Sequence, residues 1–101
     1  MNNIADTAFV APGAFVGVYA KVLGRAQILD RARIYGDAVI TDDAVVSGDA
    51  VVSGDAVIMG NARVTDHARV YGTAWISGYA QILNKAKVRD SRISGDSRVV
   101  S

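Results

Sequence analysis

The chain has 101 residues, contains no cysteine and has a single histidine, His67. The absence of cysteine excludes a disulfide scaffold, a thiolate zinc site and a cysteine nucleophile. One histidine excludes every metal site that needs two or more histidines from the same chain. The sequence therefore lacks the thiolates and the paired imidazoles on which many zinc centres depend.

A strong charge imbalance and a long apolar run are also missing. Lysine and arginine number 11 against 10 acidic residues, so a formal net charge of +1 does not indicate a nucleic-acid-binding protein. The longest uncharged run, residues 7–20, is too short for a membrane span, and no basic segment precedes it as in a signal peptide. We expect one small domain, residues 1–101, in the cytoplasm and without a membrane partner.

What the sequence has in abundance is a six-residue repeat. Alanine recurs at every sixth position from Ala8 to Ala86, and a valine or isoleucine follows each of these alanines two positions later. Two further units have serine instead of alanine, at Ser91 and Ser97, and the step from Ala86 to Ser91 is five residues instead of six. Residues i and i+2 share one face of a strand, so each unit predicts a short strand with its valine or isoleucine facing inward.

Each predicted strand is followed by a residue that tolerates a left-handed backbone. It stands two positions after the valine or isoleucine, and it is glycine, aspartate or asparagine. Such a residue permits a sharp corner, and its return at every sixth position excludes a helix. The predicted corner residues are Gly24, Asp30, Gly36, Asp42, Gly48, Gly54, Gly60, Asp66, Gly72, Gly78, Asn84, Asp90 and Gly95.

A strand and a bend of six residues cannot bury an apolar face alone, but a coiled chain can stack these side chains inside. Each strand then pairs with strands about 4.8 Å away in neighbouring coils, which is a parallel β-solenoid. Residues 33–36 (Arg-Ile-Tyr-Gly) return as residues 69–72 (Arg-Val-Tyr-Gly), and residues 26–29 return as residues 80–83. Both offsets are multiples of 18, which indicates three sides per coil.

These residues resemble the hexapeptide-repeat family, in which a large aliphatic residue is followed four positions later by a small one. Val10 and Ala14 show this spacing, as does every unit to Ala86, and the resemblance covers roughly residues 4–100. It implies an all-β fold, a left-handed, three-sided parallel β-helix of about five coils. The family's enzymes are mostly acyltransferases, commonly trimeric, and one branch are carbonic anhydrases. Residues 34–38 (Ile-Tyr-Gly-Asp-Ala) also look like repeats of uncharacterised bacterial and phage proteins of this type.

The sequence departs from that family where its enzymes carry their catalytic features. Those enzymes have loops between coils, a catalytic histidine and a C-terminal helix, whereas the spacing here never lengthens between Ala8 and Asp90 and too few residues follow Ser97 for a helix. His67 lies at a predicted corner, where a solvated histidine is the simpler interpretation; the alternative is a minimal acyltransferase-like trimer that uses His67 between chains. We expect no catalytic activity, no bound metal and no cofactor.

With 18 residues per coil, the outward-facing residues fall into columns on three sides. The first side is mixed, and the third is largely apolar. An exposed apolar patch usually marks a contact surface. The alternative is that the strand preference for β-branched residues alone explains the valines at these outer positions. We expect this third side to form a homo-oligomer, a dimer or a trimer, through Leu23, Val39, Val57, Met59 and Trp75.

The second side is basic, with interleaved tyrosines. Positive charge and stacking rings suit an anion or a nucleic acid, but a solvated sheet with ordinary charged pairs is the simpler interpretation at a net charge of +1. The residues of this alternative binding surface are Arg33, Tyr35, Arg69, Tyr71, Lys87 and Arg89.

The ends of a solenoid expose strand edges, which are templates for further pairing. Pro12, the skipped residue near Asp90 and the serines at 91 and 97 are candidate devices against such pairing; if they fail, copies stack end to end. The sequence as a whole predicts a non-catalytic scaffold or protein-binding module of a phage or bacterial assembly, which binds copies of itself and another protein.

Overall fold

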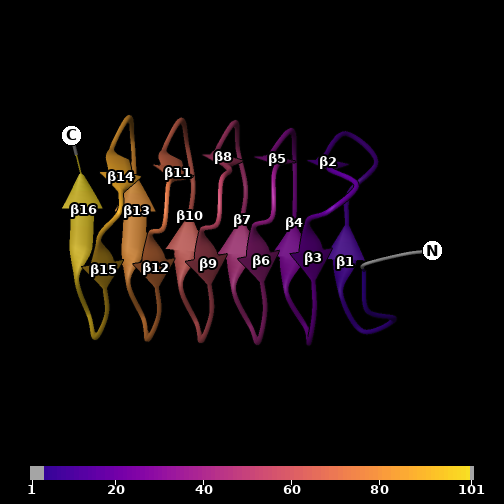
Figure 1. Cartoon of the computed structure of the whole chain (residues 1–101), viewed down its shortest axis with the longest axis horizontal. Helices are drawn as coiled ribbons and strands as arrows, with labels where there is room; N and C mark the ends of the chain where they lie inside the picture. Colours follow the sequence, from indigo (N-terminus) through magenta and orange to yellow (C-terminus); the bar gives the residue numbers. More distant parts are fainter. Residues whose placement is uncertain (1–3, 101) are drawn as a thin grey trace.

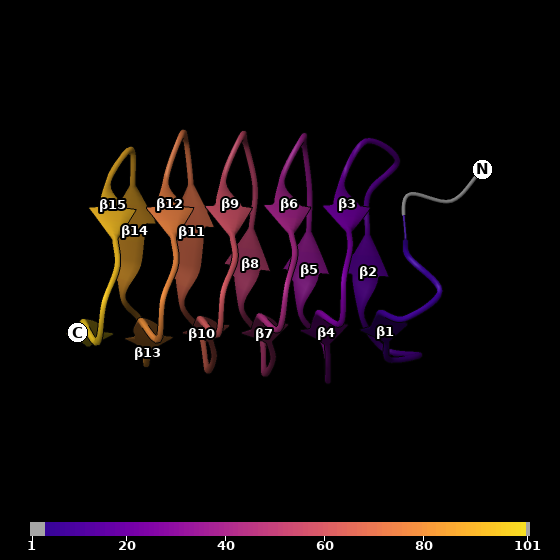
Figure 2. The ribbon, with the colours of Figure 1, turned by 90° about the horizontal axis from the view of Figure 1, so that it is seen from below.

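The computed structural model describes residues 4–100, and these form strands and no helix. Short parallel strands build three sheets around one axis, here called faces 1, 2 and 3 (Figures 1 and 2). Face 1 consists of β1 (Phe9–Val10), β4 (Gln27–Ile28), β7 (Val45–Val46), β10 (Arg63–Val64), β13 (Gln81–Leu83) and β16 (Arg98–Val100). Face 2 consists of β2 (Phe15–Val16), β5 (Arg33–Ile34), β8 (Val51–Val52), β11 (Arg69–Tyr71) and β14 (Lys87–Arg89). Face 3 consists of β3 (Lys21–Val22), β6 (Val39–Ile40), β9 (Val57–Ile58), β12 (Trp75–Ile76) and β15 (Arg92–Ile93).

The pairing register confirms the predicted three-sided solenoid of about five coils. Along most of the chain each strand pairs with the strand 18 residues later, as Val39 pairs with Val57. After the five-residue step the offset is 17, so Trp75 pairs with Arg92 and Gln81 with Arg98. The left hand of the coil, which the family resemblance implies, stays a prediction.

The inward residues of each unit fill a narrow interior. From Ala20 to Val88 every inward alanine, valine and isoleucine is buried, and no polar side chain is buried among residues 4–100. Each isoleucine or valine lies beside its counterpart in the next coil, as Ile40 does beside Ile58. Burying such a side chain contributes about 1.5–3 kcal/mol, so stacked aliphatic residues are the main source of stability.

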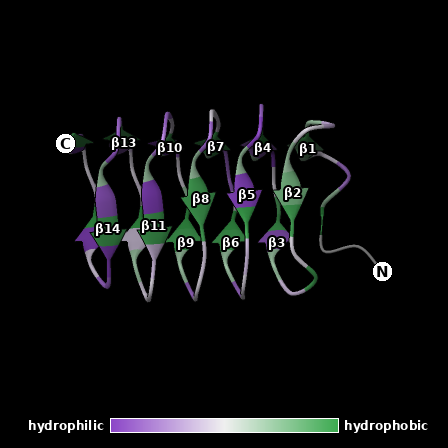
Figure 3. Ribbon diagram, turned by 90° about the horizontal axis from the view of Figure 1, so that it is seen from above, coloured by the Kyte–Doolittle hydropathy of each residue, from purple (hydrophilic) through white to green (hydrophobic). Residues whose placement is uncertain are grey.

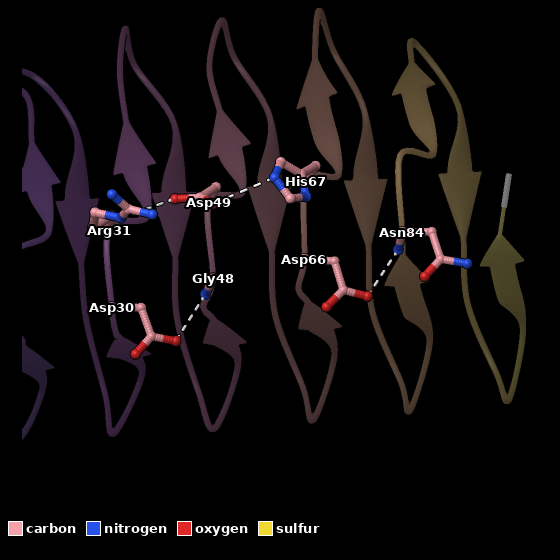
Figure 4. Close-up of polar contacts among 7 residues, drawn as sticks. All are labelled: Asp30, Arg31, Gly48, Asp49, Asp66, His67 and Asn84. Atoms are coloured by element: carbon pink, nitrogen blue, oxygen red, sulfur yellow. Dashed lines mark hydrogen bonds and ion pairs between the residues drawn. The ribbon is translucent and has the colours of Figure 1, made fainter.

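All predicted corner residues have the left-handed backbone, with φ between 55° and 68°. At Asp30, Asp42 and Asp66 the carboxylate also accepts a hydrogen bond from the corner of the next coil. The carboxylate of Asp30 accepts a hydrogen bond from the N–H of Gly48 at 3.0 Å, and that of Asp66 accepts one from the N–H of Asn84 at 3.0 Å (Figure 4). Aspartate therefore serves at a corner both by its tolerance of positive φ and by satisfying an N–H group one coil away.

The first coil departs from this geometry. Pro12 and Val18 occupy the corner positions, but neither has a positive φ, since the proline ring fixes a negative φ and a β-branched residue is strained in the left-handed region. The connections of this coil flare away from the stack toward the N-terminal end (Figures 1 and 2). Val18 and Tyr19, on one of these connections, are 80% and 73% exposed.

The shortened corner at the skipped residue is held by a side chain. At the regular corner before it, the N–H of Asp55 donates to the carbonyl of Gly72 at 2.8 Å. One coil later the N–H of Thr73 donates instead to Oδ1 of Asp90 at 2.8 Å, and the hydroxyl of Thr73 lies 3.2 Å from the same oxygen. These hydrogen bonds, chiefly that from the backbone N–H of Thr73, hold the pKa of Asp90 below its ordinary value.

Substitution of Gly54 tests the corner geometry. Gly54→Val should lower the free energy of unfolding by about 1–3 kcal/mol, because φ is +68° and a Cβ would lie 2.9 Å from the nitrogen of Gly72. Gly54→Asn is the matched control and should cost less, because asparagine tolerates positive φ. Urea denaturation measures both variants, and equal losses would contradict the explanation given for the corners.

Removing the carboxylate of Asp90 tests the shortened corner. Because the folded-state pKa lies below the ordinary 3.8, the ionised group stabilises the fold above that pH, and the contribution disappears as pH falls through the depressed value. We expect Asp90→Ala to lower the melting temperature at pH 7, with a deficit that shrinks in strong acid. Asp96→Ala is the control, since Asp96 makes no side-chain hydrogen bond or ion pair within residues 4–100. Equal deficits in the two variants would remove the role assigned to Asp90.

Candidate functional site

Face 3 brings together the apolar residues that the sequence predicted for an interface. Val39, Val57 and Trp75 lie in register on neighbouring strands of one flat sheet. Leu23 and Met59 occupy the second outward position of their coils, Leu23 exposed and Met59 half-buried. The five residues therefore share one surface.

The outward positions of face 3 carry no charge between Lys21 and Arg92. Faces 1 and 2 are interrupted by arginine within the same span, at Arg63 on face 1 and at Arg33 and Arg69 on face 2. In Figure 3 β6 and β9 of face 3 are hydrophobic throughout, as is β8 of face 2, whereas β5, β11 and β14 of face 2 combine hydrophilic and hydrophobic residues. Face 3 is thus the one face with an uncharged centre among the described coils, and Val39, Val57 and Trp75 form an apolar column within it.

Trp75 has a neighbour that the predicted columns missed. The guanidinium carbon of Arg92 lies 5.3 Å from the centroid of the Trp75 ring, a cation–π contact, and Trp75 is 43% exposed. The five-residue step moves Arg92 into the register of Trp75. Counting 17 residues instead of 18 across that step would have placed Arg92 beside Trp75 from the sequence alone.

On face 2, the structure separates the six predicted binding residues into two groups. Nη1 of Arg33 lies 3.4 Å from the hydroxyl of Tyr35, and the ring of Tyr35 lies 5.5 Å from that of Phe15 at a tilt of 44°. This N-terminal group is therefore occupied with its own contacts.

The second group of face 2 lines a shallow depression over β8, β11 and β14. Arg69, Tyr71 and Lys87 contribute to its lining, together with Val51 and Ser53. Arg89 is instead within 3.7 Å of Asp90, its neighbour in the chain. Of the six predicted residues, three therefore surround one hollow on the surface.

His67 lies at an exposed corner between faces 1 and 2, as predicted. Its Nε2 is 3.4 Å from Oδ2 of Asp49, and Oδ1 of Asp49 is 3.2 Å from Nε of Arg31, so the three side chains form a line along the corner (Figure 4). The side chain of His67 is 66% exposed. Exposed ion pairs of this kind contribute about 0–1 kcal/mol each, which is the contribution expected of a surface contact.

Within residues 4–100 no three histidine, cysteine, aspartate or glutamate side chains gather closely enough to hold a metal ion. A helix that could span a membrane is likewise missing from this part of the chain.

One surface was not predicted from the sequence. Phe9, Phe15, Val18 and Tyr19 are all exposed on the first coil. The uncharged run of residues 7–20 was the available signal, because a run without charge on a repeat of known phase must place its apolar side chains on the surface as well as inside. These side chains stand around the N-terminal coil, Phe9 on face 1, Phe15 on face 2, and Val18 and Tyr19 on the connection between β2 and β3.

Comparison with known proteins agrees with the fold. A family model described as the YdcK beta-solenoid repeat matches residues 32–48, a segment that includes β5, β6 and β7. No curated protein matches the chain. The match to the repeat and the stacked parallel strands together are consistent with a hexapeptide-repeat-like β-helix, and the chain is a β-solenoid repeat protein.

Proposed function

We propose that this β-solenoid is a non-catalytic scaffold that assembles with copies of itself through face 3, as a dimer or a trimer, and leaves its other faces for different partners. The observation that carries the proposal is the uninterrupted apolar column of Val39, Val57 and Trp75, flanked by Met59. A phage or bacterial assembly in the cytoplasm remains the predicted context.

The size of face 3 supports self-association. The molecule measures 35 × 21 × 19 Å, so one face of the prism covers about 700 Å². Standard protein interfaces bury about 800 Å² per partner, and their centres are enriched in tryptophan and methionine. One face is therefore large enough for a modest interface, and it carries Trp75 and Met59 near its apolar centre.

The charges around face 3 suit the rim of an interface. Lys21 and Arg92 lie at its two ends, and Asp37 and Asp55 stand at the corner that precedes β6 and β9. Both aspartates are exposed, and neither forms an ion pair within the described residues. Cations and anions at the border of an apolar centre favour correct orientation of a partner more than affinity.

The two terminal coils of the described residues differ in polarity. The first coil contains the uncharged run of residues 7–20, with exposed aromatic residues, whereas the last coil has serines at the repeat positions that alanine occupies elsewhere. The hydroxyl of Ser91 donates to the carbonyl of Arg89 at 3.0 Å, and that of Ser97 donates to the carbonyl of Ser94 at 2.8 Å. A polar coil is a poor match for an apolar one.

The surroundings of His67 support a non-catalytic role. A general base works best in a pocket that excludes water, whereas His67 is mostly exposed and borders a wide open depression that Asp49 and Lys85 also line. The corner spacing stays at six residues from Gly24 to Asp90, so no inserted loop covers it. The minimal acyltransferase therefore remains the second candidate, with His67 as its base.

Replacement of single outward valines tests the interface. Val45, Val51 and Val57 occupy equivalent, half-buried positions on faces 1, 2 and 3 of one coil, so Val45→Lys and Val51→Lys are matched controls for Val57→Lys. Size exclusion with light scattering should show a discrete dimer or trimer that Val57→Lys and Trp75→Lys convert to monomer and that the two controls retain. A buried unpaired lysine should weaken association about tenfold or more.

Three outcomes of this experiment would contradict the proposal. The first is a wild-type chain that stays monomeric at every concentration. The second is an equal effect of the three valine substitutions on the oligomeric state. The third is an oligomer whose mass grows with concentration and that Val57→Lys does not dissociate. The last outcome would indicate end-to-end stacking.

Acetyl-CoA tests the second candidate. We expect no acyl transfer and no rise of the melting temperature with acetyl-CoA, because a ligand that binds the folded state must stabilise it. Acyl transfer that disappears in His67→Ala would establish the acyltransferase instead. Asp49→Asn, which removes the charge beside His67, would then be the companion variant.

A further inference from the structure

The depression on face 2 contains hydrogen-bond donors and lacks a carboxylate. Its lining presents the guanidinium of Arg69, the ammonium of Lys87, the hydroxyl of Ser53 and the phenol of Tyr71, with Val51 as its apolar part. The hollow crosses three adjacent strands, β8, β11 and β14. Such a lining is complementary to an anion.

Two cationic side chains lie side by side in this depression, and neither has an acidic partner among the described residues. Arg69 and Lys87 are direct cross-strand partners, about 4.8 Å apart between strands, and like charges in this position destabilise a sheet. Elsewhere on the solenoid, Arg25 and Arg31 face an aspartate of the next coil. Neither Arg69 nor Lys87 forms an ion pair among residues 4–100. An anion placed between them would turn a repulsive pair into an attractive site.

The same lining suits one class of anion best. A guanidinium fork and an ammonium group are the side chains that bind phosphate oxygens, and a tyrosine face stacks on planar rings. We propose that the depression binds a phosphate monoester attached to a flat ring, the chemistry of a nucleoside monophosphate. Arg69 and Lys87 hold the phosphate, Ser53 donates to it, and Tyr71 packs against the ring.

The chain contains its own comparison site. Arg33 and Tyr35 repeat the sequence of Arg69 and Tyr71 on the same face, two coils earlier. Arg33, however, contacts the hydroxyl of Tyr35 and pairs across the strands with Val51 instead of a lysine. The hollow beside Arg33 is also lined by Asp49, whose charge repels an anion. We therefore expect an anion to bind beside Arg69 and Tyr71 and not beside Arg33 and Tyr35, although the two pairs have the same sequence.

Titration of the full chain with adenosine monophosphate, inorganic phosphate and adenosine tests the inference, by calorimetry or by amide chemical shifts. Adenosine monophosphate should bind more tightly than either fragment, since only it supplies both the phosphate and the ring. Binding should weaken as salt increases, because the attraction is between exposed charges.

Variants locate the site. Arg69→Ala and Lys87→Ala should each weaken binding of adenosine monophosphate about tenfold or more, since each removes a charge-assisted hydrogen bond. Tyr71→Ala should weaken the binding of adenosine monophosphate and leave the binding of inorganic phosphate unchanged. Arg33→Ala is the matched control, with the same loss of charge on the same face, and should leave the affinity unchanged. The changed side chains are outward-facing, and circular dichroism verifies that each variant folds.

Three results would overturn the inference. The first is no saturable binding of adenosine monophosphate, and the second is an equal loss in Arg33→Ala and Arg69→Ala. The third is tighter binding of a single-stranded oligonucleotide that Arg33→Ala also weakens, which would make face 2 a surface for a polymer. Because face 2 is separate from face 3, none of these results depends on self-association.

Discussion

The width of the interior is the constraint on which the rest of the structure depends. Each side of a coil has room for one alanine and one valine or isoleucine, and nothing polar is buried among the described residues. The backbone must then turn after every short strand, which explains the left-handed residue at each regular corner. Close packing of the core and regular spacing of the corners therefore depend on each other. A larger inward side chain or a longer corner would disrupt the stacking of coils.

Because inward and outward residues alternate along each strand, the width of the interior does not restrict the size or polarity of the outward side chains. One coil carries Val45, Val51 and Val57 on its three faces, yet the neighbouring coils make face 2 basic and leave face 3 apolar. Each face acquires its chemistry by substitution of outward residues alone. A solenoid can thus present separate surfaces for a copy of itself and for an anion without any change to its core.

Sequence alone predicted the features that the period determines. The strands, the corner residues and the column of Val39, Val57 and Trp75 all follow from counting. The contact between Arg92 and Trp75 depends on one missing residue, and the difference between Arg33 and Arg69 depends on what each side chain touches. Counting by 18, or by 17 past the short step, gives the cross-strand neighbours of these residues. The direction of each side chain and the contacts that it makes are tertiary properties, which the repeat does not determine.

The hydrogen bonds that Asp30, Asp42 and Asp66 accept from the next coil have a direction. In each, the carboxylate belongs to the earlier coil and the N–H group to the later one, as with Asp30 and Gly48 or Asp42 and Gly60. Synthesis on the ribosome delivers the N-terminal coils first. Each acceptor therefore leaves the ribosome before its donor, and a coil that has already folded offers the newly emerging backbone a fixed point from which the winding continues.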